Sequence, residues 1–169
     1  MASLWGFPNP VNEKAARVVA GGVVLLSLLT LITGRHWLIV PLALGFGARV
    51  ATGPKLSLLG RLATQLIAPR LGLPKFVPGP PKRFAQAIGL VLTTAAAVLS
   101  LGFGLTAVGT ALIVVLLIFA TLEAVVGFCA GCWLFGLLMR AGIIPADTCE
   151  ACNNVWTRYG TGSAITPGA

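Results

Sequence analysis

The sequence predicts an all-α membrane protein with about four transmembrane helices and one amphipathic helix on the cytoplasmic side of the membrane interface. Hydrophobic residues make up 57% of the 169-residue chain, charged residues 9%, and the mean hydropathy is +0.94. This composition leaves too little polar surface to cover a water-soluble globule. Because one helical crossing needs roughly 20 apolar residues, the length allows about four crossings. We expect one polytopic membrane domain over residues 1–156 and a flexible tail over residues 157–169.

Two apolar segments near the N-terminus predict the first two spans. Residues 15–33 form an almost unbroken apolar run, and the polar residues before it, beginning at Asn12, suit the start of a helix. Residues 37–52 form a shorter run with proline, glycine and Arg49, which predicts a kinked helix packed closely against its neighbours. The first ten residues do not have the pattern of a signal peptide, so we expect the mature chain to begin near Met1.

A strongly basic segment, residues 53–83, follows these spans. It holds half of the 12 Lys and Arg residues and no acidic residue, the cations being Lys55, Arg61, Arg70, Lys75, Lys82 and Arg83. Within it, residues 55–67 place aliphatic side chains on one helical face and polar residues on the other, which predicts the interfacial amphipathic helix. The proline-rich residues 69–83 predict an extended surface connection, because proline interrupts helices.

Two further apolar runs, residues 84–101 and 107–127, predict the third and fourth spans. The glycine-containing residues 102–106 between them carry no charge and suit a tight turn between antiparallel helices. After Gly127 the sequence stays apolar through Met139. The pattern therefore leaves open whether the fourth helix continues or breaks near the first cysteine pair.

The basic residues also predict an orientation in the membrane. Lys and Arg accumulate near the cytoplasmic ends of spans, so we expect residues 53–83 inside the cell and residues 102–106 outside. Both termini are then cytoplasmic, in a multi-pass protein of the inner (plasma) membrane. Arg35 and His36 fall on the outer side, which is a mild departure from the rule.

All four cysteines lie in the C-terminal part of the chain, residues 128–156, as two Cys-x-x-Cys pairs: Cys129 with Cys132, and Cys149 with Cys152. In a helix this spacing places two sulfurs one turn apart, close enough for a disulfide or for two ligands of one metal ion. The separation between the pairs falls in the range of four-cysteine zinc sites, so spacing alone favours metal, with zinc as the candidate cofactor. A cytoplasmic location argues against a permanent disulfide but is compatible with a catalytic dithiol.

The surroundings of the two pairs favour reactive sulfur. The first pair lies in an apolar segment, whereas zinc ribbons usually hold cysteines on polar, glycine-containing turns. In the second, Asp147 is a candidate helix N-cap with Glu150 three residues later, which places Cys149 in the first turn, where the helix dipole stabilises a thiolate. We expect Cys149 to be the nucleophile, with Glu150 opposing part of its pKa shift. Burial as small apolar residues accounts for single cysteines but not for four in two pairs.

Arg49 and Glu123 are ionisable residues within predicted spans. A charge at membrane depth costs roughly 2.5 to 3.5 kcal/mol on insertion scales, so it normally faces a partner or a cavity. Both residues lie near the cytoplasmic ends of their spans, which predicts that they form an ion pair between packed helices. We expect a structural role for this pair rather than proton delivery, because Glu123 and Cys129 point to different faces of a continuous helix.

Four stretches of the chain resemble a family of small bacterial, mainly actinobacterial, integral membrane proteins, the domain of unknown function DUF4395. They are "PNPVNEKAARVVAG" at residues 8–21, "PGPPKRFAQAIG" at 78–89, "LEAVVGFCAGCWLFGLL" at 122–138 and "CEAC" at 149–152. The resemblance covers roughly the first 155 residues and implies the membrane fold. It also implies a connection to sulfur chemistry, since family members are often encoded near thioredoxin-like proteins and rhodanese-type sulfurtransferases. The resemblance does not indicate a biochemical activity.

Together these features predict a membrane thiol–disulfide or persulfide relay. A soluble thioredoxin-like or sulfurtransferase partner would exchange with Cys149 and Cys152, and these with Cys129 and Cys132, which requires contact between the pairs. Two alternatives stay open: a membrane scaffold with a structural four-cysteine zinc site, and a transporter of a sulfur compound. The sequence does not decide whether the protein is an enzyme or an oligomer. The net charge of +8 serves membrane topology and not nucleic-acid binding, because the cations are spaced between apolar runs.

Overall fold

The computed structural model describes residues 9–53, 55, 57–73, 75–145 and 148, and this part of the chain is predominantly helical. Within it, three helical stretches are long and apolar enough to cross a membrane: Glu13–Thr33, Gly79–Gly102 and Thr106–Val125. The stretch His36–Thr52 is also apolar but shorter. The all-α membrane class is therefore confirmed, and the predicted second span is the shortest of the four.

Capping residues mark the two ends of the first helix, and a short turn connects it to the second. Helix α1 (Glu13–Thr33) starts after Asn12, whose side-chain Oδ1 accepts the backbone N–H of Lys14 at 3.0 Å. It ends at Gly34, which takes the left-handed conformation with a φ of 66°. A 3₁₀ turn, η1 (His36–Leu38), then leads directly into α2 (Ile39–Thr52).

The predicted amphipathic segment is helical over residues 58–71, as α3 (Leu58–Leu62), a π-helical turn η2 (Ala63–Ile67) and a 3₁₀ turn η3 (Ala68–Leu71). Its predicted apolar face divides into two parts. Leu59 lies close to Gly22 of α1, and Ala63 is fully buried. Leu62 and Leu66 remain exposed. The segment thus packs on α1 with one edge and presents an apolar edge outward.

The proline-rich connection ends earlier than the sequence predicts. Strand β2 (Phe76–Val77) pairs antiparallel with β1 (Val11–Asn12), and α4 (Gly79–Ala97) begins immediately afterwards. The expected extended stretch up to residue 83 is wrong here because Pro80 and Pro81 occupy the first turn of α4, where a missing N–H breaks no helical bond. Lys82 therefore belongs to a helix and not to a loop.

The chain breaks between the fourth span and the first cysteine pair. Helix α4 continues through a π-helical turn, η4 (Val98–Gly102), and a short turn leads into α5 (Thr106–Val125). Gly127 then adopts a φ of 77°, and α6 (Ala130–Arg140) starts in a new direction. This resolves the question that the continuous apolar pattern leaves open.

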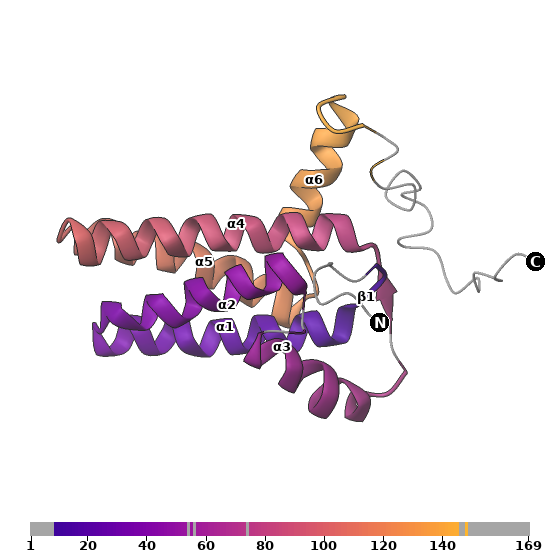
Figure 1. Ribbon diagram of the computed structural model, residues 1–169, viewed down its shortest axis with the longest axis horizontal. Helices are drawn as coiled ribbons and strands as arrows, with labels where there is room; N and C mark the ends of the chain where they lie inside the picture. The colour runs from indigo at the N-terminus through magenta and orange to yellow at the C-terminus, as the bar shows by residue number, and fades with distance from the viewer. Residues whose placement is uncertain (1–8, 54, 56, 74, 146–147, 149–169) are drawn as a thin grey trace, which may run out of the picture.

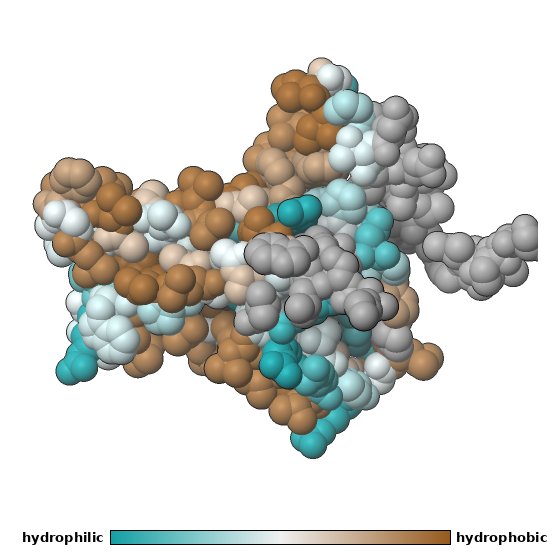
Figure 2. All heavy atoms as spheres, viewed as in Figure 1, coloured by the Kyte–Doolittle hydropathy of each residue, from teal (hydrophilic) through white to brown (hydrophobic). Residues whose placement is uncertain are grey.

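Helices α1, α2, α4 and α5 lie side by side, and α6 leaves the bundle at a steep angle near the end where α4 begins (Figure 1). Helix α4 packs against α2, α5 and α6, while α1 packs against α5. The face of the bundle seen in Figure 2 is largely apolar, as expected for helices that face lipid. The core consists of Val23, Ile39, Leu42, Phe46, Ala96, Ile113, Leu116 and Ala120.

Candidate functional site

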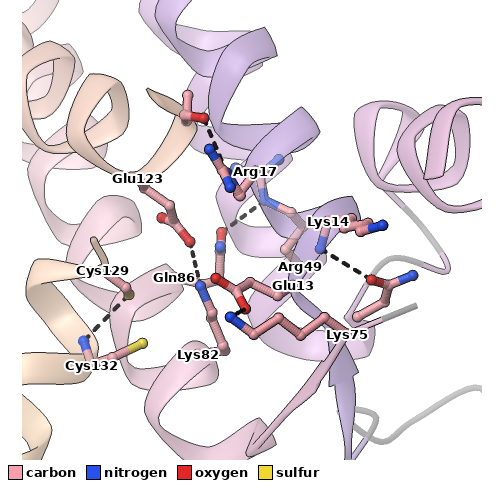
Figure 3. A network of polar contacts seen from close by, with 12 residues as sticks. Glu13, Lys14, Arg17, Arg49, Lys75, Lys82, Gln86, Glu123, Cys129 and Cys132 are labelled. Atoms are coloured by element: carbon pink, nitrogen blue, oxygen red, sulfur yellow. Dashed lines mark hydrogen bonds and ion pairs between the residues drawn. The ribbon is translucent and has the colours of Figure 1, made fainter. Parts of the chain in front are cut away.

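Charged side chains from four helices meet at one end of the bundle, where α1 and α4 begin and α2 and α5 end (Figure 3). We call this group the polar cluster, and it consists of Glu13, Arg17, Arg49, Lys82, Gln86 and Glu123. Two of its cations, Arg49 and Lys82, are only 4% and 6% exposed. Charges this deeply buried require partners from neighbouring helices.

The ion pair at the centre of the polar cluster joins Lys82 to Glu123. Lys82 Nζ and Glu123 Oε1 lie 2.6 Å apart, and their side chains are 7% and 15% exposed. The direct Arg49–Glu123 pair predicted from the sequence is therefore not formed, because α4 begins early enough to place a lysine beside the acid. One sequence signal could have found Lys82: it and Glu123 lie at nearly equal numbers of residues from the turn between α4 and α5.

Arg49 uses other partners within the same cluster. Its Nε donates to Gln86 Oε1 at 2.8 Å, its Nη1 donates to Ser57 Oγ at 3.2 Å, and its guanidinium lies 4.3 Å from the centroid of the Phe46 ring. Its Nη2 is buried and has no hydrogen-bond partner among the described residues. Glu123 still acts on Arg49 electrostatically without contacting it. Arg49 thus retains one unused donor inside the bundle.

Arg17 fixes the end of α5. Its Nη2 donates to the backbone oxygen of Val125 at 2.6 Å and its Nε to that of Ala124 at 3.2 Å. These carbonyls belong to the last turn of α5, which has no helical donors left for them. Beyond them, a Cβ atom on Gly127 would lie 3.3 Å from Glu13 Oε1. The turn that leads to the first cysteine pair is therefore held against the start of α1.

The first cysteine pair stands at the start of α6. Cys129 is the N-cap residue, and its Sγ accepts the backbone N–H of Cys132 at 3.4 Å. Both thiols are free; Cys132 is buried and Cys129 is half-buried. Gly131 between them allows α6 to approach α4, since a Cβ atom there would lie 2.6 Å from Ala85. The pair is thus pressed against the helix that carries Lys82.

The surroundings make the two thiols unequal. Both lie beyond the end of α5. Three groups lower the pKa of Cys129 below its ordinary value: the thiol of Cys132, which hydrogen-bonds to the Cys129 sulfur, the ammonium group of Lys82, and the backbone N–H of Cys132. Burial and the carboxylate of Glu123 act in the opposite direction. The same hydrogen bond and burial raise the pKa of Cys132. Cys129 is therefore the better thiolate of the pair.

Glu123 lies closer to this chemistry than the sequence predicts. A continuous helix would point Glu123 and Cys129 to different faces, but the break at Gly127 turns the chain and brings both to one cavity. The carboxylate also acts electrostatically on Cys129. The expected separation of Glu123 from the cysteines is therefore wrong.

The cavity has a volume of about 390 Å³ and extends from Cys129 into the bundle. Arg49, Gln86 and Glu123 are polar residues of its wall, and most of the remaining wall is apolar. Side chains of α1, α2, α4, α5 and α6 contribute to this wall. Cys129 thus adjoins a mainly apolar space whose wall includes a few polar residues.

The second cysteine pair, Cys149 and Cys152, lies outside the described residues, as do Asp147 and Glu150 and the predicted tail. Among the residues that the structure describes, no group of three or more His, Cys, Asp or Glu side chains could hold a metal ion. A four-cysteine zinc site would need both pairs. It therefore remains the alternative interpretation of the sequence.

Comparison with known proteins gives one match. The sequence profile of the family described as "Domain of unknown function (DUF4395)" matches residues 11–140, a range that contains the first cysteine pair and helices α1 to α6 of the described part of the chain. No curated protein and no solved structure matches the chain.

Proposed function

The chain belongs to the DUF4395 family, and from its own residues we propose that it is a membrane thiol–disulfide exchange protein in which Cys129 and Cys132 form the working pair. One observation carries the proposal: a free Cys-x-x-Cys dithiol begins a helix beside a buried lysine–glutamate pair, and its first cysteine, Cys129, lines a cavity. A purely structural cysteine pair requires neither a stabilised thiolate nor access to a cavity.

Cys129 is the attacking group in this proposal. Its thiolate attacks one sulfur of a donor disulfide, and the Cys132 thiol then resolves the mixed disulfide. The Cys129–Cys132 disulfide forms, the donor disulfide becomes two thiols, and two electrons and two protons pass between the pairs. The reverse reaction regenerates the dithiol. We assign the uptake of the proton from the resolving thiol to Glu123, because this residue lines the same cavity as Cys129.

We assign the connection to soluble proteins to Cys149 and Cys152. These residues would exchange with a thioredoxin-like protein on one side and with Cys129 and Cys132 on the other. A rhodanese-type sulfurtransferase would use the same thiols to deliver sulfane sulfur in place of electrons. The lipid bilayer is the remaining partner.

A redox titration tests this function. The reduced full-length protein is equilibrated in thiol–disulfide buffers of graded potential, alkylated and digested, and the masses of the peptide with Cys129 and Cys132 are measured. We expect one two-electron transition to the disulfide. In the double variant Cys149→Ser/Cys152→Ser the transition should remain, while reduction by a soluble thioredoxin should be lost.

Three outcomes would contradict the proposal. The pair could stay reduced at every potential, or one zinc ion per chain could remain bound until unfolding, which is the scaffold alternative. An added sulfur atom on Cys129 after incubation with thiosulfate and a rhodanese would identify sulfur transfer and not electron transfer as the function.

We further propose that the polar cluster faces the cytoplasm and that residues 58–71 lie in the membrane interface. The exposed leucines of this segment and its basic residues favour a headgroup environment that contains anionic lipid. In a variant without native cysteines, Leu73→Cys should resist a membrane-impermeant thiol reagent on intact cells, whereas Phe103→Cys should react. Both native side chains are well exposed, so the comparison is matched. The opposite labelling would invert the orientation.

A further inference from the structure

We infer that the cavity beside Cys129 binds a lipid-soluble quinone, which accepts the two electrons of the Cys129–Cys132 dithiol. This inference rests on the proposed function and adds the electron acceptor to it. Three features of the cavity support it: the chemistry of its wall, the buried cation of Arg49 in that wall, and the exposed aromatic side chains at its edge.

The wall selects an apolar occupant of moderate size. Side chains such as Val23, Leu92 and Leu116 line the cavity deep in the bundle, and its volume is about 390 Å³. Cavities of this size and composition bind compact, mostly apolar molecules that carry a few polar atoms. A peptide or an oxidised glutathione would bring several charges and amide groups into an apolar space, where they would lack partners.

Arg49 indicates what the polar end of the occupant must offer. The residue is 4% exposed, it lines the cavity, and its Nη2 has no acceptor among the described residues. A buried cation at the wall of an apolar cavity favours an occupant that carries a hydrogen-bond acceptor. A quinone carbonyl is a neutral acceptor, and the cation beside it would also stabilise the negative charge that develops on that oxygen during reduction.

Part of the cavity wall lies at the outer surface of the molecule. Three aromatic side chains of its wall are also well exposed: Phe119 at 44%, Phe128 at 40% and Trp133 at 57%. They belong to α5, to the turn after it and to α6, so the mouth lies between these helices. An apolar rim admits a molecule dissolved in the bilayer and hinders entry of water-soluble oxidants.

The reaction balances without another reagent. Two S–H bonds break in Cys129 and Cys132, one S–S bond forms between them, and the quinone becomes the hydroquinone. Two electrons and two protons leave the thiols and end in the two O–H bonds of the product. The disulfide is then available to oxidise the second cysteine pair, so that electrons flow from a soluble dithiol partner to the membrane.

Binding is tested on the full chain in quinone-free lipid nanodiscs with decylubiquinone as the probe. We expect saturable quenching of tryptophan fluorescence that disappears in Trp133→Phe. Ala120→Leu and Ala16→Leu, which fill the cavity, should each weaken binding roughly tenfold, about the effect expected from losing one good contact. Ala111→Leu places the same change on an exposed site of α5 outside the cavity and should have no effect.

Electron transfer is tested under anaerobic conditions with the reduced protein. One hydroquinone should form per Cys129–Cys132 disulfide, and Cys129→Ser should bind the probe but form none. The inference is overturned if oxidised glutathione oxidises the dithiol normally while decylubiquinone is neither bound nor reduced, or if all three leucine variants bind it equally. If no oxidant forms the disulfide, the proposed function fails even where the probe still binds.

Discussion

The two ends of the helical bundle satisfy their polar groups in different ways. At the end with the two short turns, hydroxyl groups bond to their own helix: Thr30 to the oxygen of Leu26, and Ser100 to that of Ala96. At the opposite end, the polar cluster joins separate helices through charged side chains, as in Lys82–Glu123. A hydroxyl group that bonds to a carbonyl of its own helix affects that helix alone. A buried charge, by contrast, costs folding free energy and needs a compensating role.

This contrast indicates where function resides. The cross-helix contacts of the polar cluster hold the start of α6, the dithiol and the cavity in one arrangement. At the other end, the described cross-helix side-chain contact is His36 Nε2 with Thr110 Oγ1 at 3.2 Å, between groups that need carry no charge. Similar substitutions at the two ends should therefore change the free energy of unfolding by different amounts.

The largest effect is expected from breaking the central ion pair. Glu123→Gln leaves Lys82 buried without a counter-charge, and such a loss costs about 3–5 kcal/mol of unfolding free energy. His36→Phe at the opposite end should cost less than about 1.5 kcal/mol. Chemical denaturation in detergent measures both. Combining Glu123→Gln with Lys82→Met should recover part of the loss, and a double variant as damaged as the sum of the singles would refute the pairing.

An intermediate effect is expected at the end of α5. Arg17→Met removes two charge-assisted hydrogen bonds to backbone oxygens and should lower stability by about 1.5–3 kcal/mol. Arg35→Met changes an exposed arginine at the other end and should stay within about 0.5 kcal/mol. Equal melting temperatures for the two variants would contradict the difference between the ends.

The smallest effect on stability is expected at the turn before the dithiol. Gly127→Ala forces a side chain into the left-handed region at a φ of 77° and should cost about 1–2 kcal/mol. Gly136→Ala, within α6 and with open space at its Cβ, should be neutral or stabilise by up to about 1 kcal/mol. Gly127→Ala should also slow oxidation of the dithiol, measured by alkylation and mass spectrometry, because the turn positions Cys129. An unchanged oxidation rate would show that the turn at Gly127 does not position Cys129.

Periodicity and composition predict the spans well because a lipid-facing helix needs little more than apolar residues and good caps. The amphipathic helix predicted at residues 55–67, the apolar helices and the polar start at Asn12 follow from these local rules, although the helical segment observed is residues 58–71. The same rules also explain why one prediction, the loop at the start of α4, is wrong. Prolines at residues 80 and 81 suggest a loop by composition, yet in the first turn they are compatible with a helix.

The arrangement of the site depends on contacts that local patterns do not encode. The sequence marks Glu123 as needing a partner, but whether Arg49 or Lys82 supplies it depends on where α4 begins. It predicts thiol chemistry for both cysteine pairs, with Cys149 as the nucleophile, but the break at Gly127, and not helical phase, places Cys129 beside the cavity. Both errors arise where tertiary packing overrides a local assumption.

The central claim is that the arrangement at the start of α6 makes Cys129 the reactive thiolate of the first pair, and the pH dependence of its alkylation tests this most directly. The full-length reduced protein is treated with iodoacetamide between pH 5 and pH 10, and the modification of Cys129 and Cys132 is followed separately by mass spectrometry. Because the pKa of Cys129 is lowered and that of Cys132 is raised, Cys129 should react first. Its rate should still be high below the pH at which an ordinary cysteine, with a pKa of about 8.5, becomes protonated.

Lys82→Met should move this profile to higher pH, since it removes a cation that favours the thiolate, while Lys75→Met, at an exposed lysine of the same end, should not. A profile for Cys129 centred at the ordinary cysteine pKa, or faster modification of Cys132 at every pH, would contradict the account.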